Sequence, residues 1–190
     1  MSSLNFDDIV QAWDEAGASG QEGLIHPLTG PEYWASGRAQ ATEVAEFAKP
    51  GATVVDFACG DGRITIPLAQ DGYKVIAADA SPAMLERVTA NTEAEGFEVQ
   101  TVLSTGDDLA EQLGKKKADV ILARAVFIHH DYAGVERIVT GLAKALKKGL
   151  ELKGYAVDWL PDPEKARSRI LLYRQEYDLI ILDLMLPGLD

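Results

Sequence analysis

The sequence predicts a doubly wound α/β fold, with a mostly parallel sheet of about six strands and helices on both faces. Two observations support this prediction. Short apolar runs rich in β-branched residues, such as "TVVDFA" at 53–58 and "KVIAAD" at 74–79, are typical of strands buried on both faces. These runs alternate with helical segments, and a strand–helix–strand connection places its two strands parallel in one sheet.

Two helices are expected before the alternating part begins. Residues 5–18 carry apolar side chains at helical spacing, and a loop rich in glycine and proline follows at 19–31. A second helix is predicted over about 33–48, where "KPG" at 49–51 ends it. The expected buried residues are Phe6, Ile9, Val10 and Trp13 in the first helix, and Tyr33, Trp34, Val44 and Phe47 in the second.

The alternating part predicts a Rossmann-like domain. Ser81 and Pro82 open one helix, because serine caps a helix and proline suits its first position. Pro67 is compatible with a helix capped by Arg63, since the first four N–H groups of a helix have no intrahelical partner. Asp131 is expected to cap a later helix. The predicted strands are 53–58, 74–79, 98–103, 119–124, 155–160 and 178–183, and the predicted helices are 63–71, 82–95, 132–147 and 162–174.

Composition restricts the possible settings and partners. With 190 residues, of which 47% are hydrophobic, the chain is expected to form a single domain over 1–190. The net charge of −12 argues against a nucleic-acid partner, because phosphate binding needs clustered lysine and arginine. One cysteine excludes an internal disulfide, and we find neither a secretory signal nor an apolar run long enough to span a membrane. We therefore predict a cytoplasmic protein that binds a small molecule.

The most informative stretch is "VVDFACGDGRITIPLA" at 54–69, in which a buried strand, a glycine-rich turn and a helix follow one another. Glycine lets a ligand approach the backbone closely, and the helix start offers N–H groups to a polar ligand. A dinucleotide-binding fingerprint would need glycine where the chain has Thr65. A P-loop would need Gly-Lys followed by Ser or Thr, and that triplet is absent from the sequence.

The stretch resembles motif I of class I S-adenosylmethionine-dependent methyltransferases. The match runs through Asp56, Ala58, Gly60 and Gly62, with alanine in place of the motif's first glycine. Asp79 ends the next strand, where an acid is placed to accept hydrogen bonds from ribose hydroxyls. The resemblance covers residues 30 to about 148 and implies S-adenosylmethionine or S-adenosylhomocysteine as the ligand.

The resemblance also implies roles for other residues. In "ASPAML", Ala80 and Met84 would contact the adenine, and in "STGDDL" Asp107, preferred to Asp108, would accept from its exocyclic amine. Tyr33 and Arg38, in "EYWASGRAQA", are candidates for the methionine carboxylate.

No catalytic residue is assigned, because methyl transfer often needs only proximity and alignment. His129 or His130 is a candidate general base, and the alternative is that both are polar loop residues. No metal site is expected.

The C-terminal residues 150–190 resemble part of a response-regulator receiver domain. In "DLIILDLMLPGLD", Asp183 occupies the place of the phosphate acceptor. A working receiver needs an acidic pair on a neighbouring strand to hold Mg²⁺, and "DVILARAV" offers Arg124 and no acid. We therefore interpret Asp183 as a vestigial phosphoacceptor, and phosphorelay function is not predicted.

These two resemblances together predict an engineered chimera, in which a methyltransferase-like part (1–149) is completed by a receiver-like strand–helix–strand unit (150–190). Three hypotheses follow: a protein that keeps the cofactor site but has lost methyl transfer, an active small-molecule methyltransferase, or a purely structural protein. Whether the chain is an enzyme stays open at this point. The last strand would lie at a sheet edge, which allows either a monomer or a dimer through that edge.

Overall fold

The structure is a computed structural model that describes residues 6–19, 28–127 and 130–152. All of these residues belong to one compact unit, Met1–Ala156. The predictions for the strands at 155–160 and 178–183, the helix at 162–174, Asp183 and the C-terminal dimer edge lie outside the described residues.

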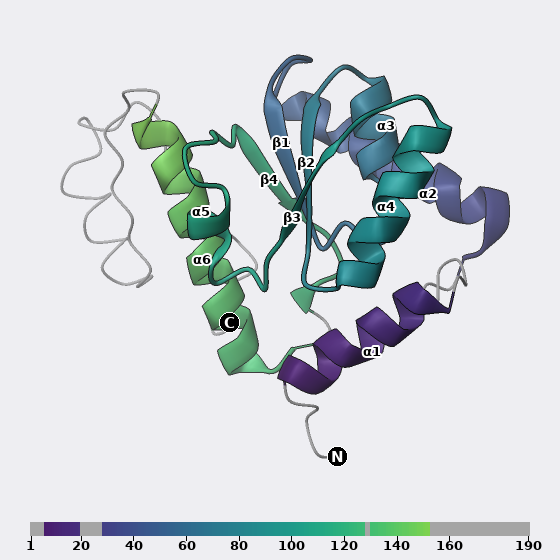
Figure 1. The fold of residues 1–190 in the computed structure, drawn as a ribbon. Coiled ribbons are helices and arrows are strands. Elements are labelled where there is room, and N and C mark those ends of the chain that lie inside the picture. Colours follow the sequence, from purple (N-terminus) through teal and green to yellow (C-terminus); the bar gives the residue numbers. More distant parts are fainter. Residues whose placement is uncertain (1–5, 20–27, 128–129, 153–190) are drawn as a thin grey trace, which may run out of the picture. The chain divides into compact units, whose positions relative to one another are not determined.

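The core of the described unit is a parallel sheet (Figure 1). Its strands are β1 (Thr53–Phe57), β2 (Lys74–Asp79), β3 (Gln100–Leu103) and β4 (Val120–Ala123), in the order β3-β2-β1-β4. All three strand pairs are parallel, and Phe57 is in register with both Ala78 and Ala123. The carboxyl ends of the strands therefore share one edge of the sheet. The parallel α/β prediction is confirmed, with four strands rather than about six among the described residues.

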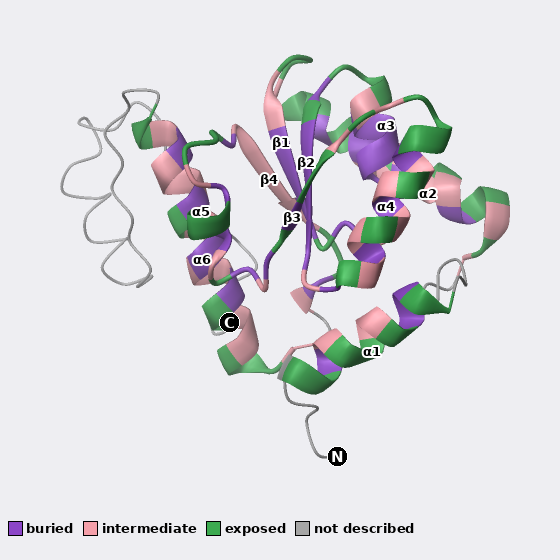
Figure 2. Ribbon diagram, viewed as in Figure 1, coloured by how far each residue is buried: buried purple, intermediate pink, exposed green. Residues whose placement is uncertain are grey.

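In the part of the chain that the structure describes, five helices cover the two faces of this sheet, and a sixth, α1 (Phe6–Ala18), lies across the carboxyl ends of the strands against α4 (Pro82–Ala94) (Figure 1). The covering helices are α2 (Gly30–Glu43), α3 (Thr65–Gln70), α4, α5 (Leu109–Gln112) and α6 (Tyr132–Glu151), and a short 3₁₀ turn, η1 (Val44–Glu46), follows α2. Alternate strand residues divide between two clusters. Val55 and Phe57 pack with residues of α5 and α6, whereas Val54 packs with residues of α2 and α3. Figure 2 shows the strands β1 and β2 buried between these helical layers.

Two of the three helix starts predicted from the sequence are confirmed, and the predicted cap of the third, Arg63, is wrong. The Ser81 hydroxyl caps α4 by accepting from the Met84 N–H at 3.1 Å, and Asp131 caps α6 by accepting from the Gly134 N–H at 2.8 Å. Helix α3 begins at Thr65, with Ile64 rather than Arg63 at its N-cap. Pro67 is therefore its third residue, where a missing N–H removes no helical hydrogen bond.

The second helix differs from its prediction. It begins at Gly30 and ends at Glu43, where the chain tightens into η1. A 3₁₀ turn advances the chain by 3.0 rather than 3.6 residues per turn, so later side chains leave the buried face. Tyr33 and Val44 are buried as predicted, whereas Phe47 is 77% exposed, and its predicted burial is wrong.

Among the described residues, no helix is both long and apolar enough to cross a membrane.

Candidate functional site

The glycine-rich loop at residues 58–62 lies between the carboxyl end of β1 and the start of α3. Three of its residues have left-handed backbone: Ala58 (φ 59°), Gly60 (φ 56°) and Gly62 (φ 94°). A Cβ at Gly60 would meet nothing within 4 Å, whereas a Cβ at Gly62 would lie 2.8 Å from Val88 Cγ2. Gly60 therefore keeps open space in front of the loop, and Gly62 allows α4 to pack against it.

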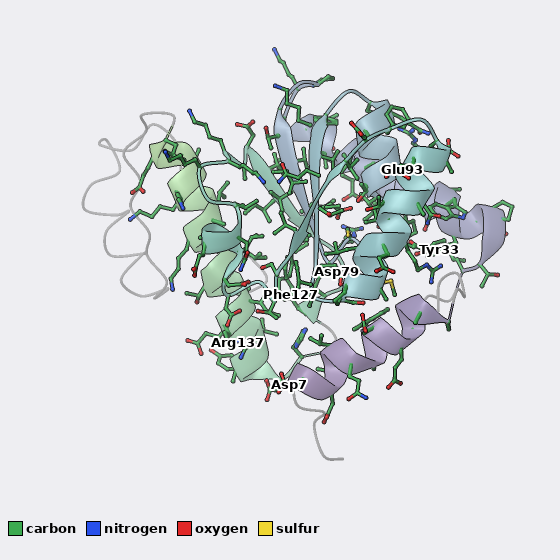
Figure 3. The ribbon with its side chains drawn as sticks, viewed as in Figure 1. Asp7, Tyr33, Asp79, Glu93, Phe127 and Arg137 are labelled. Atoms are coloured by element: carbon green, nitrogen blue, oxygen red, sulfur yellow. The ribbon has the colours of Figure 1, made fainter. Side chains whose placement is uncertain are left out.

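Asp79 closes the loop against the next strand. It ends β2 at the carboxyl edge of the sheet (Figure 3), where one carboxylate oxygen accepts from the Gly60 N–H and the other from the Ser81 N–H, each at 3.0 Å. Burial raises the pKa of this carboxyl above its usual value. A carboxylate has about four lone-pair sites, so two backbone donors leave capacity for a ligand.

Asp56 supports the loop from below. Only 2% of it is exposed, and Thr65, the first residue of α3, donates its hydroxyl to the carboxylate at 2.6 Å. Burial raises the pKa of Asp56 to about 6, and the nearby Asp79 acts in the same direction. Asp56 therefore connects β1 to α3, and its burial keeps its carboxylate from contacting a ligand directly.

The residues predicted to contact adenine follow β2 and β3. Ala80 is half-buried and Met84 is buried, one turn into α4. Asp107 is exposed and forms an ion pair with Arg137 at 3.3 Å. Asp108 accepts from Ser104 Oγ at 2.6 Å and occupies the N-cap position of α5. Its carboxylate therefore stabilises the segment between β3 and α5.

The two residues predicted for the methionine carboxylate are separated by the fold. The Tyr33 hydroxyl donates to Asp61, in the glycine-rich loop, at 2.7 Å. Burial, followed by the charge of Asp61, raises the pKa of Tyr33. Arg38 instead pairs with Asp71, just after α3, at 2.6 Å. The structure therefore brings Tyr33 to the glycine-rich loop and places Arg38 at the other end of α3.

Sequence reasoning missed two charged residues, Asp61 in the loop and Arg63 directly after it. Both are buried, and the Arg63 guanidinium lies 5.2 Å from the centre of the Tyr33 ring and donates to Ser36 Oγ at 2.8 Å. The available signal was the presence of two opposite charges inside "CGDGR", a turn otherwise made of small residues.

Cys59, the single cysteine of the chain, is also buried in this loop. Its pKa is raised well above the usual value, first by burial and then by the charges of Asp79 and Asp56. A buried thiol with a raised pKa is a packing group rather than a nucleophile.

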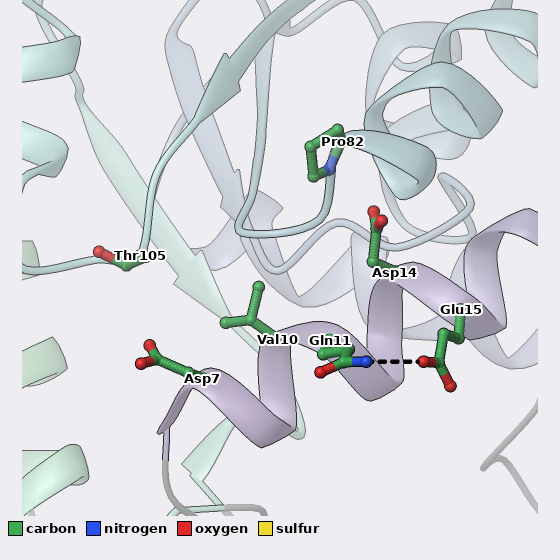
Figure 4. A pocket seen from close by; sticks show the side chains of 7 residues that line it. All are labelled: Asp7, Val10, Gln11, Asp14, Glu15, Pro82 and Thr105. Carbon is green, nitrogen blue, oxygen red and sulfur yellow. Dashed lines mark hydrogen bonds between the residues drawn. The ribbon is translucent and has the colours of Figure 1, made fainter.

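Helix α1 forms the outer wall of a pocket at the ends of β2 and β3. The pocket measures about 510 Å³ and lies between α1 and the segments that carry Pro82 and Thr105 (Figure 4). Its lining residues on α1 are Asp7, Val10, Gln11, Asp14 and Glu15. The sequence predicted α1 as an amphipathic helix but not its place over this edge.

His129 lies outside the described residues. Among the residues that the structure does describe, no group of three or more His, Cys, Asp and Glu side chains could hold a metal ion.

The chain matches the family model described as "Methyltransferase domain" over residues 54–149, about half of its length. It is 25% identical over 145 residues to a ubiquinone biosynthesis O-methyltransferase of Rickettsia conorii, covering 67% of this chain and 48% of that protein. It is 31% identical over 100 residues to an uncharacterized methyltransferase of Synechocystis, covering 53% of this chain and 44% of that protein. The chain thus spans about half the length of these relatives.

Solved structures share the fold. The magnesium protoporphyrin IX methyltransferase of Synechocystis with bound S-adenosylmethionine has a TM-score of 0.58 and 24% identity, over 76% of this chain and 74% of that one. The phosphoethanolamine N-methyltransferase 1 of Haemonchus contortus, in complex with phosphoethanolamine and S-adenosylhomocysteine, has a TM-score of 0.59 and 19% identity, over 77% of this chain and 31% of that one.

These comparisons support the methyltransferase resemblance found in the sequence and not the receiver-domain resemblance. They give no support to a receiver-derived segment or to an engineered chimera, which stay predictions about residues outside the described part. The matched region 54–149 contains the glycine-rich loop, Asp79 and Asp107. The predicted cofactor agrees with the family, which uses S-adenosylmethionine. The chain therefore belongs to the family of class I S-adenosylmethionine-dependent methyltransferase domains.

Proposed function

We propose that this chain is the cofactor-binding part of an active methyltransferase that acts on a small-molecule acceptor. The observation that carries the proposal is the open glycine-rich loop beside a buried carboxylate, Asp79, at the carboxyl edge of a methyltransferase-family sheet. Ligands of open α/β sheets bind at this edge. Of the hypotheses drawn from the sequence, the comparisons favour the active enzyme over a chimera that has lost methyl transfer.

The residues present fit an adenosyl cofactor. Space in front of Gly60 lets a ligand approach the backbone, and Asp79 has acceptor capacity left for ribose hydroxyls. Ala80 and Met84 offer apolar surface to the adenine. Asp107 is the more available of the two acids near its amine, because it is exposed, whereas the Asp108 carboxylate already accepts from Ser104, Thr105 and Gln112.

The methionine end of the cofactor carries an amine and a carboxylate, and two buried charged residues, Asp61 in the loop and Arg63 next to it, offer one charge for each. We assign the amine to Asp61 and the carboxylate to Arg63, with Tyr33 aligning Asp61 through its hydroxyl. Arg38 is left out of this assignment because it pairs with Asp71.

The bound cofactor supplies an electrophilic methyl group. The chain's own residues position the cofactor: the loop and Asp79 hold the adenosyl part, and Asp61 and Arg63 hold the methionine part. Proximity and alignment then lower the barrier to transfer. The described residues provide no assigned base, so the first acceptors to test are those that ionise readily by themselves.

The names of the curated relatives direct the choice of acceptor. Several are O-methyltransferases of ubiquinone biosynthesis, so we propose an oxygen nucleophile of the phenol or catechol class as the first acceptor to test. The net charge of −12 agrees with a small acceptor rather than a nucleic acid.

Two measurements test the proposal. Calorimetric titration with S-adenosylhomocysteine should show binding that Asp79→Asn weakens, and a phenol and catechol panel should release S-adenosylhomocysteine from S-adenosylmethionine. An absence of binding would refute the proposal as a whole. Binding without turnover on any oxygen, nitrogen or sulfur acceptor would instead favour the hypothesis of a site without methyl transfer.

The assignment of Arg63 has its own test. Arg63→Met should weaken S-adenosylhomocysteine while leaving methylthioadenosine, which lacks the amino-acid part, almost unchanged. Arg38→Met is the matched control, because it removes the same charge from the far end of α3. If both ligands weaken equally in Arg63→Met, the arginine supports the fold and does not bind the carboxylate.

A further inference from the structure

Helix α1 is attached to the start of α4 by one side chain. Asp14 Oδ1 accepts from the Ser81 hydroxyl at 2.8 Å and from the Ala83 N–H at 3.0 Å. These donors lower the pKa of Asp14, so the carboxylate is charged at neutral pH. A negative charge is favourable at this position because the first N–H groups of a helix carry partial positive charge.

Ser81 connects this attachment to the proposed ligand site. Its side chain is fully buried; the hydroxyl gives its only proton to Asp14 and uses a lone pair to accept from the Met84 N–H at 3.1 Å. The backbone N–H of the same residue donates to Asp79 Oδ1 at 3.0 Å. A continuous chain of hydrogen bonds therefore runs from α1 through Ser81 to Asp79, and from Asp79 to Gly60.

The packing leaves α1 little freedom to approach this site differently. A Cβ at Gly17 would lie 2.9 Å from Ala83 Cβ, so the helix rests directly on the first turn of α4. Asp14 and Gly17 are one turn apart on α1 and hold the same short segment, 81–83. The pocket wall formed by α1 is therefore fixed to the segment that directly follows Asp79.

We infer that Asp14 is a positioning residue for the adenosyl ligand: it holds Ser81, and through Ser81 it orients the Asp79 carboxylate that receives the ribose. The inference deepens the proposed function and rests on it, because it requires that Asp79 binds ribose hydroxyls. It gives α1 a role in recognition of the cofactor as well as in covering the pocket.

The role of the Asp14 charge can be separated from the role of its hydrogen bonds. Both bonds of Asp14 use a single oxygen, Oδ1, as acceptor. Asparagine also offers one such oxygen, so Asp14→Asn should keep both bonds, whereas Asp14→Ala removes them.

The test compares S-adenosylhomocysteine with its analogue lacking the ribose 2′-hydroxyl, by titration of each variant. In wild type, the full ligand should bind more tightly than the deoxy analogue. In Asp14→Ala, we expect about tenfold weaker binding of the full ligand, the size of one charge-assisted hydrogen bond, and little change for the analogue. In Asp14→Asn, the preference should return to within about threefold of wild type.

The matched control is Glu86→Ala, which removes one exposed carboxylate from α4, the helix to whose first turn Asp14 is bonded. It should leave the preference for the full ligand unchanged. If Asp14→Ala fails to fold, Ser81→Ala tests the same link, because it keeps the backbone N–H used by Asp79 and loses the hydroxyl held by Asp14.

The outcomes are distinct. Equal weakening of both ligands in Asp14→Ala, or no weakening of either, overturns the positioning role while the proposed function stands. Loss of the preference with rescue by Asp14→Asn supports it. Wild-type protein that binds neither ligand refutes the proposed function and this inference with it.

Discussion

Two glycines of the same loop allow a controlled comparison between close packing and ligand access. Gly62 is buried against α4, where an added Cβ would lie 2.8 Å from Val88 Cγ2, and Gly60 faces open space. Both have positive φ, so alanine is strained at either position. We expect Gly62→Ala to destabilise the fold severely and Gly60→Ala to destabilise it mildly while obstructing the ligand.

The magnitudes follow from these contacts. Left-handed backbone costs alanine about 1–2 kcal/mol, and the lower entropy of the unfolded chain returns about 0.4–1 kcal/mol. Gly60→Ala should therefore cost about 1 kcal/mol. At Gly62, overpacking adds about 1–3 kcal/mol, because Val88 is fully buried and β-branched side chains are rotationally stiff in helices. Gly62→Ala should therefore cost about 2–4 kcal/mol.

Urea unfolding followed by circular dichroism gives both free energies of unfolding, and titration with S-adenosylhomocysteine gives the affinities. Val88→Ala in the Gly62→Ala background is the internal control, since it removes the clashing methyl group and should cost less than the sum of the single changes. Equal stability of the two glycine variants would refute the packing role of Gly62. Undiminished affinity in Gly60→Ala would refute the role of Gly60 in ligand approach.

Three further changes test other parts of the structure. Ala58→Gly should raise the free energy of unfolding by about 0.5–1 kcal/mol, because φ 59° strains alanine, and urea unfolding that shows destabilisation would contradict this. Asp56 has a folded pKa of about 6 against 3.8 unfolded, so its contribution to stability is present below about pH 4 and is lost as pH rises through 6. Between about pH 4 and 7, the free energy of unfolding should fall less in Asp56→Asn than in wild type, by up to about 3 kcal/mol. Unfolding measured across this pH range checks this, and parallel pH profiles of the two proteins would exclude the raised pKa of Asp56. Asp131→Ala should cost about 1 kcal/mol and lower the melting temperature, because it removes the cap of α6; an unchanged melting temperature would show that the cap is dispensable.

The sequence predicted those elements whose signals are local. Ser81-Pro82 located the start of α4, and "KVIAAD" located β2 to the residue. The position of Asp79 at the carboxyl edge follows from the parallel sheet, because every strand ends at the same side. Periodicity and capping act over a few neighbouring residues, and a single sequence carries that information.

Contacts between distant segments could not be predicted in the same way. Arg38 and Arg63 are both near acids in space, and only the fold decides that Arg38 meets Asp71 while Arg63 lies over Tyr33. Asp14 reaches Ser81 across 67 positions of chain, and its sequence neighbourhood resembles any acidic helix surface. Phe47 was misplaced because a 3₁₀ turn shifts the helical phase by a fraction of a residue, which apolar spacing does not reveal.

The burial of Cys59 makes the loop observable without adding a probe. Its thiol is the only one in the chain, and it is both protonated and 6% exposed while the loop is closed. Alkylating reagents attack an accessible thiolate, so the labelling rate reports how often this segment opens. A bound adenosyl compound should slow the labelling, so the alkylation rate of Cys59 reports cofactor exchange.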